Sequence, residues 1–419
     1  MKRLLQSKLL SNTLIFTLST FLNKGLNFFI LPVLTHYLTR DDYGHLGFIV
    51  SVVAIASIYI GLWPGNFLMA KFSSYGKERM QGYLFNILVI TLISFFVVMG
   101  FMFAVKNLLF VNFHDPGKLI VLISVYTLFV VVFNIFNTIV QLEKNALKYA
   151  LFQSLYLFTS LGLALVLIIW FKFDWRGKFY AELFVLSLIA AYALYYFVHA
   201  GYLRFAFSWQ KIKELFNYLF PMTFHVIGLF IMGTIDKVFL ARYLTLDAVG
   251  IYTIAMTMSI IINILFDSAI KAWEPYFFEK IVEPTKENMR FIFMTVLLYT
   301  LFVIVSAVVY VYVVPYVFSV MIDAKFSEAL AYIPLLVIGF SFEGVRKPLA
   351  SFLMHQNRVK TLGFISLLAA GLNIVLNIVL IQQYGIAGAA YATIASFAFL
   401  YFVTIFLVAK YYPLHTLLK

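Results

Sequence analysis

Long apolar runs alternate with short polar segments along the whole chain, and this alternation predicts its elements. A helix needs about 20 mostly apolar residues to cross a bilayer. Twelve runs reach this length, at 10–36, 45–66, 80–105, 119–141, 149–171, 179–200, 215–243, 249–271, 291–322, 329–354, 361–381 and 385–409. The last two form one charge-free stretch, which we divide at the polar turn QQYG (382–385). The pattern therefore predicts an all-α polytopic membrane protein with twelve transmembrane helices.

Composition agrees with this fold class. Hydrophobic residues make up 63% of the chain and charged residues 12%, whereas a soluble domain has about 45–50% apolar and about 25% charged residues. Cysteine is absent, which excludes disulfides and thiolate metal sites. The N-terminal stretch MKRLLQSKLLSNTLIF runs into an apolar segment that is too long for a signal peptide, so we expect it to remain as the first helix.

The distribution of positive charge predicts the orientation. Twelve spans place both termini on one side of the membrane. The odd-numbered loops carry eight Lys and Arg residues, Lys178 among them, whereas the termini and the even-numbered loops carry eighteen. The positive-inside rule then places both termini in the cytoplasm. It also accounts for the net charge of +13 without nucleic-acid binding.

Short sequences recur about half a chain apart. YLTRDDYG at 37–44 returns as YLTLDAVG at 243–250, and NALKYALFQSL at 145–155 returns as NRVKTLGFISL at 357–367. We therefore expect two six-helix lobes, 1–200 and 214–419, joined by a cytoplasmic linker at 201–213. Because six is even, the lobes are parallel repeats around a central cavity, as in transporters. In the repeated turn, Thr39 and Thr245 are interpreted as helix caps rather than transport residues.

Polar side chains inside the spans indicate function, because a charge in mid-bilayer costs a few kcal/mol unless it faces a partner or water. Asn23, Lys24 and Asn27 lie on one polar face of the first span, which contains no acidic residue. A lysine paired with a carboxylate on another helix would explain this face. We favour a water-filled, cationic cavity.

Further charges lie in the second half. Asp236 and Lys237 are adjacent, about 100° apart on a helix, so one is expected to face the cavity and the other a neighbouring helix. Asp267 can pair with a lysine four residues later, at 271. On span 10, Glu343 can neutralise only one of Arg346 and Lys347, which predicts a net positive patch.

Ser366, Asn373 and Asn377 share a face of span 11, which we interpret as contacts between helices.

These positions form the predicted site. The substrate-binding cavity is assigned to Asn23, Lys24, Asn27, Lys237, Arg346 and Lys347, and the ion-coupling candidates are Asp236, Asp267 and Glu343. The positive excess suits a phosphate-bearing substrate better than an organic cation. The chain has no P-loop and no metal-ligand spacing, so we expect no cofactor and no catalytic residue. A membrane-embedded glycosyltransferase is the less supported alternative.

Three stretches resemble a known family, the Wzx-type oligosaccharide flippases of the multidrug/oligosaccharidyl-lipid/polysaccharide exporter superfamily. The stretches are NTLIFTLSTFLNKGLNFFILPVLTHYLTRDDYG (12–44), the segment 235–280 that begins IDKVFLARYLTLDAVG, and the segment 357–396 that begins NRVKTLGFISLLAAGLN. Twelve expected spans differ from the fourteen usual for lipid II flippases of that superfamily. Drug-exporting relatives, which have twelve spans, remain the alternative.

The resemblance implies translocation of an undecaprenyl-pyrophosphate-linked oligosaccharide across the bacterial inner membrane by alternating access. The product would feed O-antigen, lipopolysaccharide or capsule synthesis. It further implies a monomer that works beside a polysaccharide polymerase and a chain-length regulator, with coupling to H⁺ or Na⁺ left open.

Overall fold

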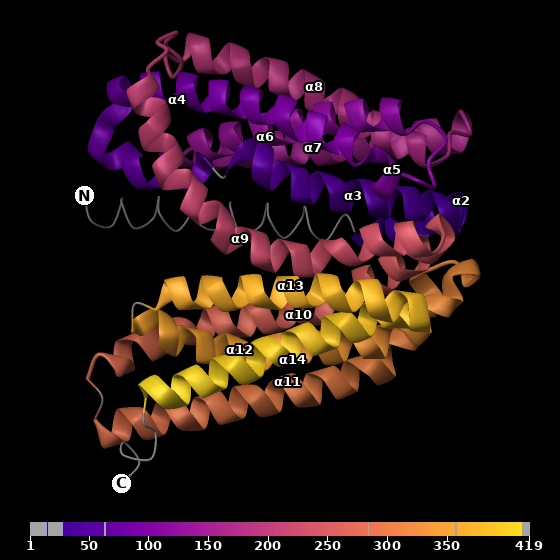
Figure 1. The fold of residues 1–419 in the computed structure, drawn as a ribbon, viewed down its shortest axis with the longest axis vertical. Coiled ribbons are helices and arrows are strands. Elements are labelled where there is room, and N and C mark those ends of the chain that lie inside the picture. Colours follow the sequence, from indigo (N-terminus) through magenta and orange to yellow (C-terminus); the bar gives the residue numbers. More distant parts are fainter. Residues whose placement is uncertain (1–14, 16–27, 63, 284, 357, 413–419) are drawn as a thin grey trace. The chain divides into compact units, whose positions relative to one another are not determined.

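A computed structural model describes residues 15, 28–62, 64–283, 285–356 and 358–412. The regular elements of these residues are helices, with no strand among them (Figure 1). The all-α fold predicted from the sequence is therefore confirmed for the described part of the chain. Contacts divide the chain into two compact units, Met1–Thr223 and Phe224–Lys419, and the division falls inside helix α9.

In the first unit, α6 is the central helix. It is largely buried, and it packs against α3, α4, α7 and α8. The elements of this unit are α2 (Leu31–Tyr37), α3 (Arg40–Gly61), α4 (Pro64–Ala104), α5 (Lys106–Leu109), α6 (Pro116–Leu142), α7 (Ala146–Leu165) with its π-helical end η1 (Val166–Trp170), α8 (Trp175–His199) and the start of α9 (Trp209–Tyr243).

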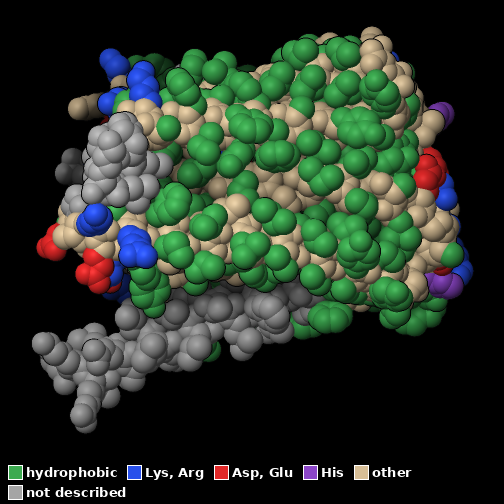
Figure 2. All heavy atoms as spheres, turned by 90° about the horizontal axis from the view of Figure 1, so that it is seen from below, with side chains coloured by type: hydrophobic (Ala, Val, Ile, Leu, Met, Phe, Trp, Pro, Cys, Tyr) green, Lys and Arg blue, Asp and Glu red, His purple; other side chains and the backbone are tan. Residues whose placement is uncertain are grey.

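In the second unit, α12 is central and packs against α10, α11 and α14. α11 has most of its apolar surface exposed, as expected of a helix that faces lipid. The elements are the end of α9, α10 (Leu246–Ile281), α11 (Lys286–Met321), the 3₁₀ helix η2 (Ala324–Ala331), α12 (Ile333–His355), α13 (Val359–Tyr384) and α14 (Ile386–Tyr411). Figure 2 shows one face of the molecule with hydrophobic side chains over its middle and charged ones at its two ends.

Nine described helices are long and apolar enough to cross a membrane, or ten if η2 and α12, bent by 48°, count as one span. They agree in position with ten of the expected spans. The first expected span lies mostly outside the described residues. The seventh corresponds to α9, which is not among the nine. Twelve spans in two repeats therefore stay a prediction.

The repeated turn caps a helix in both places. In the first unit, the Thr39 hydroxyl accepts from Asp42 N at 3.1 Å while the Asp42 carboxylate accepts from Thr39 N at 2.9 Å. In the second unit, the Thr245 hydroxyl accepts from Ala248 N at 3.2 Å. These bonds satisfy N–H groups that have no partner within the helix. The helix caps predicted at Thr39 and Thr245 are confirmed.

Helices α13 and α14 are joined by a tight turn at the predicted boundary. Gly385 ends α13 with φ +60° and ψ −135°, a backbone conformation that is nearly restricted to glycine. Gly388, in the first turn of α14, lies so close to the backbone of Leu380 that a Cβ atom would overlap it. The absence of two side chains therefore permits this close packing.

The turn generates a stability prediction. Gly388→Ala is expected to destabilise the protein by about 1–3 kcal/mol, because overpacking forces the backbone to shift. Gly371→Ala in α13 is the control, since its Cβ would contact nothing within 4 Å. Thermal unfolding in detergent should show a lower midpoint for Gly388→Ala and no loss for Gly371→Ala. Equal midpoints for the two variants would refute the role assigned to Gly388.

Candidate functional site

One buried carboxylate joins four helices of the second unit. Asp236 of α9 is 1% exposed. Its Oδ2 accepts hydrogen bonds from the Tyr252 hydroxyl of α10 at 2.6 Å and from the Thr393 hydroxyl of α14 at 3.0 Å. Its Oδ1 accepts from the Asn377 amide of α13 at 2.8 Å. A buried charge is costly unless it is hydrogen-bonded, and these three donors provide that compensation.

The amides of α13 extend this cluster. Asn373 and Asn377 are fully buried, and Asn377 Nδ2 also donates to the Asn373 carbonyl oxygen at 2.9 Å. The prediction that this face of the helix makes contacts between helices is confirmed for Asn377. The Asn373 Nδ2 and Asn377 Oδ1 atoms are buried without a hydrogen-bond partner among the described residues. Among the described residues, these two amides therefore retain one unused donor and one unused acceptor.

A second acidic group binds a cation within its own helix. In α12, the Glu343 carboxylate accepts from Arg346 Nε and Nη2, both at 2.7 Å. The side chains are 13% and 10% exposed. These two hydrogen bonds form the bidentate arrangement that is typical of arginine–carboxylate pairs. Glu343 thus neutralises Arg346, as the sequence predicts for one of the two cations on this helix.

The other cation of α12 is neutralised from α10. Lys347 Nζ donates to Asp267 Oδ1 at 2.5 Å and to Asn263 Oδ1 at 2.8 Å. The expected net positive patch on α12 is therefore wrong, and so is the pairing of Asp267 within its own helix. The close approach of α10 and α12 explains both differences. A Cβ on Gly344 would lie 2.8 Å from the Phe266 ring, so only glycine permits this approach.

The remaining predicted cavity residues lie elsewhere. Asn23, Lys24 and Asn27 fall outside the described residues. Lys237 is partly buried next to Asp236 in α9. Of the nine predicted positions, the structure brings together Glu343 with Arg346 and Lys347 with Asp267, and it places Asp236 in a separate cluster.

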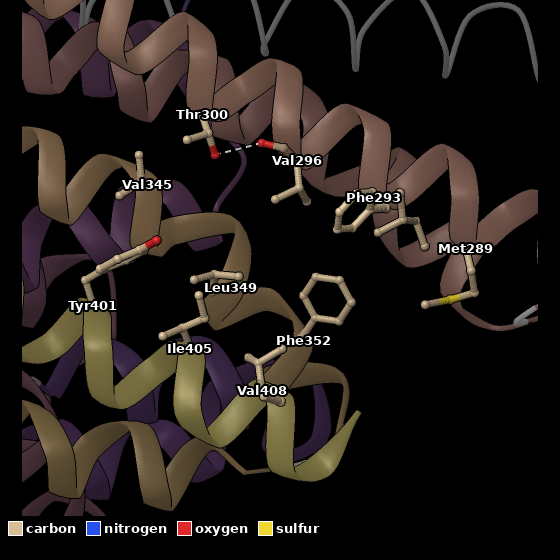
Figure 3. A pocket seen from close by; sticks show the side chains of 12 residues that line it. Met289, Phe293, Val296, Thr300, Val345, Leu349, Phe352, Tyr401, Ile405 and Val408 are labelled. Atoms are coloured by element: carbon tan, nitrogen blue, oxygen red, sulfur yellow. Dashed lines mark hydrogen bonds between the residues drawn. The ribbon is translucent and has the colours of Figure 1, made fainter. Parts of the chain in front are cut away.

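An apolar cleft opens among α11, α12 and α14. It measures about 190 Å³, and apolar side chains line most of it (Figure 3). The Thr300 hydroxyl, one of its polar groups, donates to the Val296 carbonyl oxygen of its own helix at 2.9 Å. No charged residue is among its described lining residues. This cleft can accept a hydrocarbon chain, and it does not suit a phosphate group.

Sequence reasoning overlooked an ion pair in the first unit. Lys178 was expected in a loop, but α8 begins at Trp175 and includes it. Its ammonium contacts the carboxylate of Glu182, one turn further on, and both side chains line a cavity. The spacing of four residues between a Lys and a Glu was visible in the sequence. The position of the helix start was not visible in the sequence, because polar residues lie in the first turn of α8.

The sequence relates this chain to a known protein family. The model of a family described as polysaccharide biosynthesis protein matches residues 9–280. This range covers more than half of the chain. The chain belongs to the polysaccharide biosynthesis protein family.

Curated relatives of this family member are distant. A protein of the Lsg locus of Haemophilus influenzae is 20% identical over 281 residues, which cover 65% of this chain and 66% of the relative, just under two thirds of its length. An uncharacterized membrane protein of the same organism is 22% identical over 86% of this chain and 87% of its own length.

Solved structures resemble the fold. The lipid II flippase MurJ in an inward closed conformation matches with a TM-score of 0.72 at 13% identity, over 97% of this chain and 90% of MurJ. An inward-facing multidrug resistance MATE transporter of the MOP superfamily matches with a TM-score of 0.65 at 13% identity, over 96% and 95%. The polysaccharide biosynthesis protein described here therefore has a MOP-type transporter fold.

The ion pair on α12 yields a prediction for this family member. Glu343→Gln leaves the Arg346 charge buried and unpaired, which is expected to cost about 3–5 kcal/mol. Replacing both residues by leucine should restore most of that loss, because no buried charge remains. The amount of folded protein after size-exclusion chromatography measures both effects, with Glu279→Gln on the exposed face of α10 as the control. A stable Glu343→Gln protein would show that the pair is not structural.

Proposed function

We propose that the protein is a flippase that moves an undecaprenyl-pyrophosphate-linked oligosaccharide across the bacterial inner membrane. The observation that carries the proposal is the family match over residues 9–280. The fold alone does not discriminate, because it is similar both to a lipid II flippase and to multidrug transporters. The family description concerns polysaccharide synthesis, which favours a lipid-linked sugar over a drug as the transported substrate.

The proposed reaction is transport without covalent chemistry. The glycan and pyrophosphate enter a polar cavity, the lipid chain stays in the bilayer, and the protein alternates between inward- and outward-open states. Both termini lie in the cytoplasm. The product serves O-antigen, lipopolysaccharide or capsule synthesis, next to a polymerase and a chain-length regulator. The protein acts as a monomer without a cofactor.

Two groups of cations are available for the pyrophosphate. Arg346 and Lys347 would have to exchange their carboxylate partners for phosphate oxygens, so they are the weaker choice. The stronger choice is Lys24, with Asn23, Asn27 and Lys237. A cleft of about 550 Å³ in the first unit adds two lysines, Lys71 and Lys213, against one carboxylate, Glu214, and this positive excess supports an anionic headgroup.

For ion coupling, Asp236 is the best supported of the three carboxylates. Asp267 and Glu343 each hold a cationic side chain, whereas the partners of Asp236 are hydroxyl and amide groups. The buried Asn377 Oδ1 lies in the same cluster and offers one more oxygen ligand. A proton or a sodium ion bound here would neutralise the buried carboxylate.

The substrate proposal predicts a cellular phenotype. Deleting the gene should cause a lipid-linked oligosaccharide to accumulate in the inner leaflet, and the intact gene should remove it. Lys24→Ala should reduce flipping by about tenfold or more, because a charge-assisted hydrogen bond contributes about 1.5–3 kcal/mol. Lys24→Arg should retain part of the activity.

The control for Lys24 is Lys106→Ala, which changes an exposed lysine in α5. Membrane abundance must be compared in every strain, since a purely structural lysine would lower abundance together with flipping. Normal abundance with normal flipping in Lys24→Ala would refute the cationic cavity. A deletion strain that accumulates no lipid-linked oligosaccharide but becomes sensitive to organic cations would favour the multidrug exporter.

The coupling proposal predicts an altered ion response. Asp236→Asn removes the charge while it keeps the size of the side chain, so flipping in this variant should no longer respond to pH or sodium. Tyr252→Phe is the matched control, because it removes one hydrogen bond to Asp236 and leaves the carboxylate. Flipping assayed in proteoliposomes with imposed gradients gives the readout. An unchanged ion response in Asp236→Asn would exclude this carboxylate.

A further inference from the structure

A partly open cavity of about 390 Å³ lies inside the first unit, among α3, α6, α7 and α8. This volume falls within the range of about 300–1,000 Å³ that is typical of small-molecule sites. Apolar residues of α3 form one wall, and aromatic and polar side chains of the other three helices form the rest. Among the predicted site residues that the structure describes, none lines this cavity.

The polar centre of the cavity is a neutral ion pair. Glu182 Oε1 contacts Lys178 Nζ, and Glu182 Oε2 accepts from the Tyr126 hydroxyl of α6 at 2.9 Å. The Glu182 and Lys178 side chains are 17% and 19% exposed, so both remain accessible from the cavity. The hydroxyl of Tyr156 from α7 lies beside that of Tyr126. These contacts place three hydrogen-bonding groups around the Glu182 carboxylate.

Three uncharged polar side chains add to this set. Ser57 of α3, Asn134 of α6 and Gln153 of α7 line the same cavity. Hydroxyl and amide groups can each donate and accept hydrogen bonds. Because Lys178 and Glu182 cancel, the described lining carries no net charge. The cavity therefore does not suit a phosphate, and it does suit a neutral ligand with several hydroxyl groups.

Aromatic rings provide flat surfaces in the same cavity. Tyr126 and Phe179 lie with ring centroids 5.5 Å apart, and so do Phe133 and Tyr156. Aromatic faces beside a carboxylate would also attract an organic cation. The Lys178 ammonium opposes such a ligand, because it already neutralises Glu182 and would repel a second positive charge at short range. Aromatic faces combined with uncharged polar edges match a sugar ring, whose faces carry C–H groups and whose edge carries hydroxyls.

We propose that this cavity is a sugar-binding site that receives part of the glycan during transport, with Glu182, Gln153 and Tyr156 as hydrogen-bonding groups. The proposal rests on the proposed flippase function and adds to it a glycan subsite within the first unit. Specificity for the sugar would then depend on α6, α7 and α8.

The test uses the absence of cysteine in the chain. Ala54→Cys places one thiol in the cavity wall, and the rate of its reaction with a maleimide reports occupancy. The sugar probe is the water-soluble oligosaccharide that mild acid releases from the lipid fraction accumulated by the deletion strain. The cation probe is tetraphenylphosphonium. In the purified full-length protein, the oligosaccharide should slow labelling, and tetraphenylphosphonium should not.

Two variants then identify the binding groups. Glu182→Gln and Gln153→Leu should each raise the oligosaccharide concentration needed for half-protection, by about tenfold for Glu182→Gln, which loses a charged acceptor. Gln153→Leu leaves the ion pair intact and so covers the case in which Glu182→Gln fails to fold. Glu143→Gln is the matched control, since Glu143 also accepts from a tyrosine, Tyr196 at 2.5 Å, and does not line the cavity.

The outcomes separate this proposal from the proposed function. Protection by tetraphenylphosphonium alone would overturn the sugar site in favour of an organic-cation site. Absence of protection by either probe, in a strain that still flips its lipid-linked glycan, would overturn the cavity assignment and leave the flippase function standing. A deletion strain that accumulates no lipid-linked oligosaccharide would refute both proposals.

Discussion

The hydrocarbon core of a bilayer offers no water to a polar group, so each buried polar side chain of a membrane protein must find its partner inside the protein. This constraint accounts for the internal contacts described above. Asp236 receives three donors from three other helices, Arg346 binds Glu343 with two hydrogen bonds, and Lys347 reaches across to Asp267. The contacts of Asp236 and of Lys347 also fix how neighbouring helices face one another, since a rotated helix would leave a charge unpaired.

The same constraint explains what could be predicted from the sequence. Ten of the expected spans agree with the described helices or the bent pair, because the length of an apolar run is a local property. The caps at Thr39 and Thr245 were predictable for the same reason. The partner of each buried charge, in contrast, is not a local property of the sequence. Lys347 lies 80 residues from Asp267, and Thr393 lies 157 residues from Asp236. A single sequence gives the number of charges in a span, and only the packing of helices decides which charge meets which.

The paired charges change the interpretation of the predicted cationic cavity. Counting residues in the spans indicated a positive excess, but two of the cations in that count are bound to carboxylates in this structure. The proposed substrate combines a charged pyrophosphate with a glycan, so one cationic site would not recognise the whole of it. A cleft with two lysines and one glutamate and a neutral, aromatic-lined cavity, both in the first unit, are chemically suited to these two parts. Separate sites for the pyrophosphate and the glycan thus agree better with the structure than a single cationic cavity does.

If glycan and coupling ion bind in different units, they do not compete for one residue. Coupling then has to arise because each ligand binds one conformational state more tightly than the other, and the free energy of coupling equals that difference in affinity. The Asp236 cluster suits this role. Its donors come from α10, α13 and α14, so neutralising the carboxylate would weaken bonds to three helices at once. The cavity around Glu182 likewise joins α6 and α8 through its hydrogen bonds. Under the proposed alternating access, binding at either cluster would alter hydrogen bonds that hold helices together.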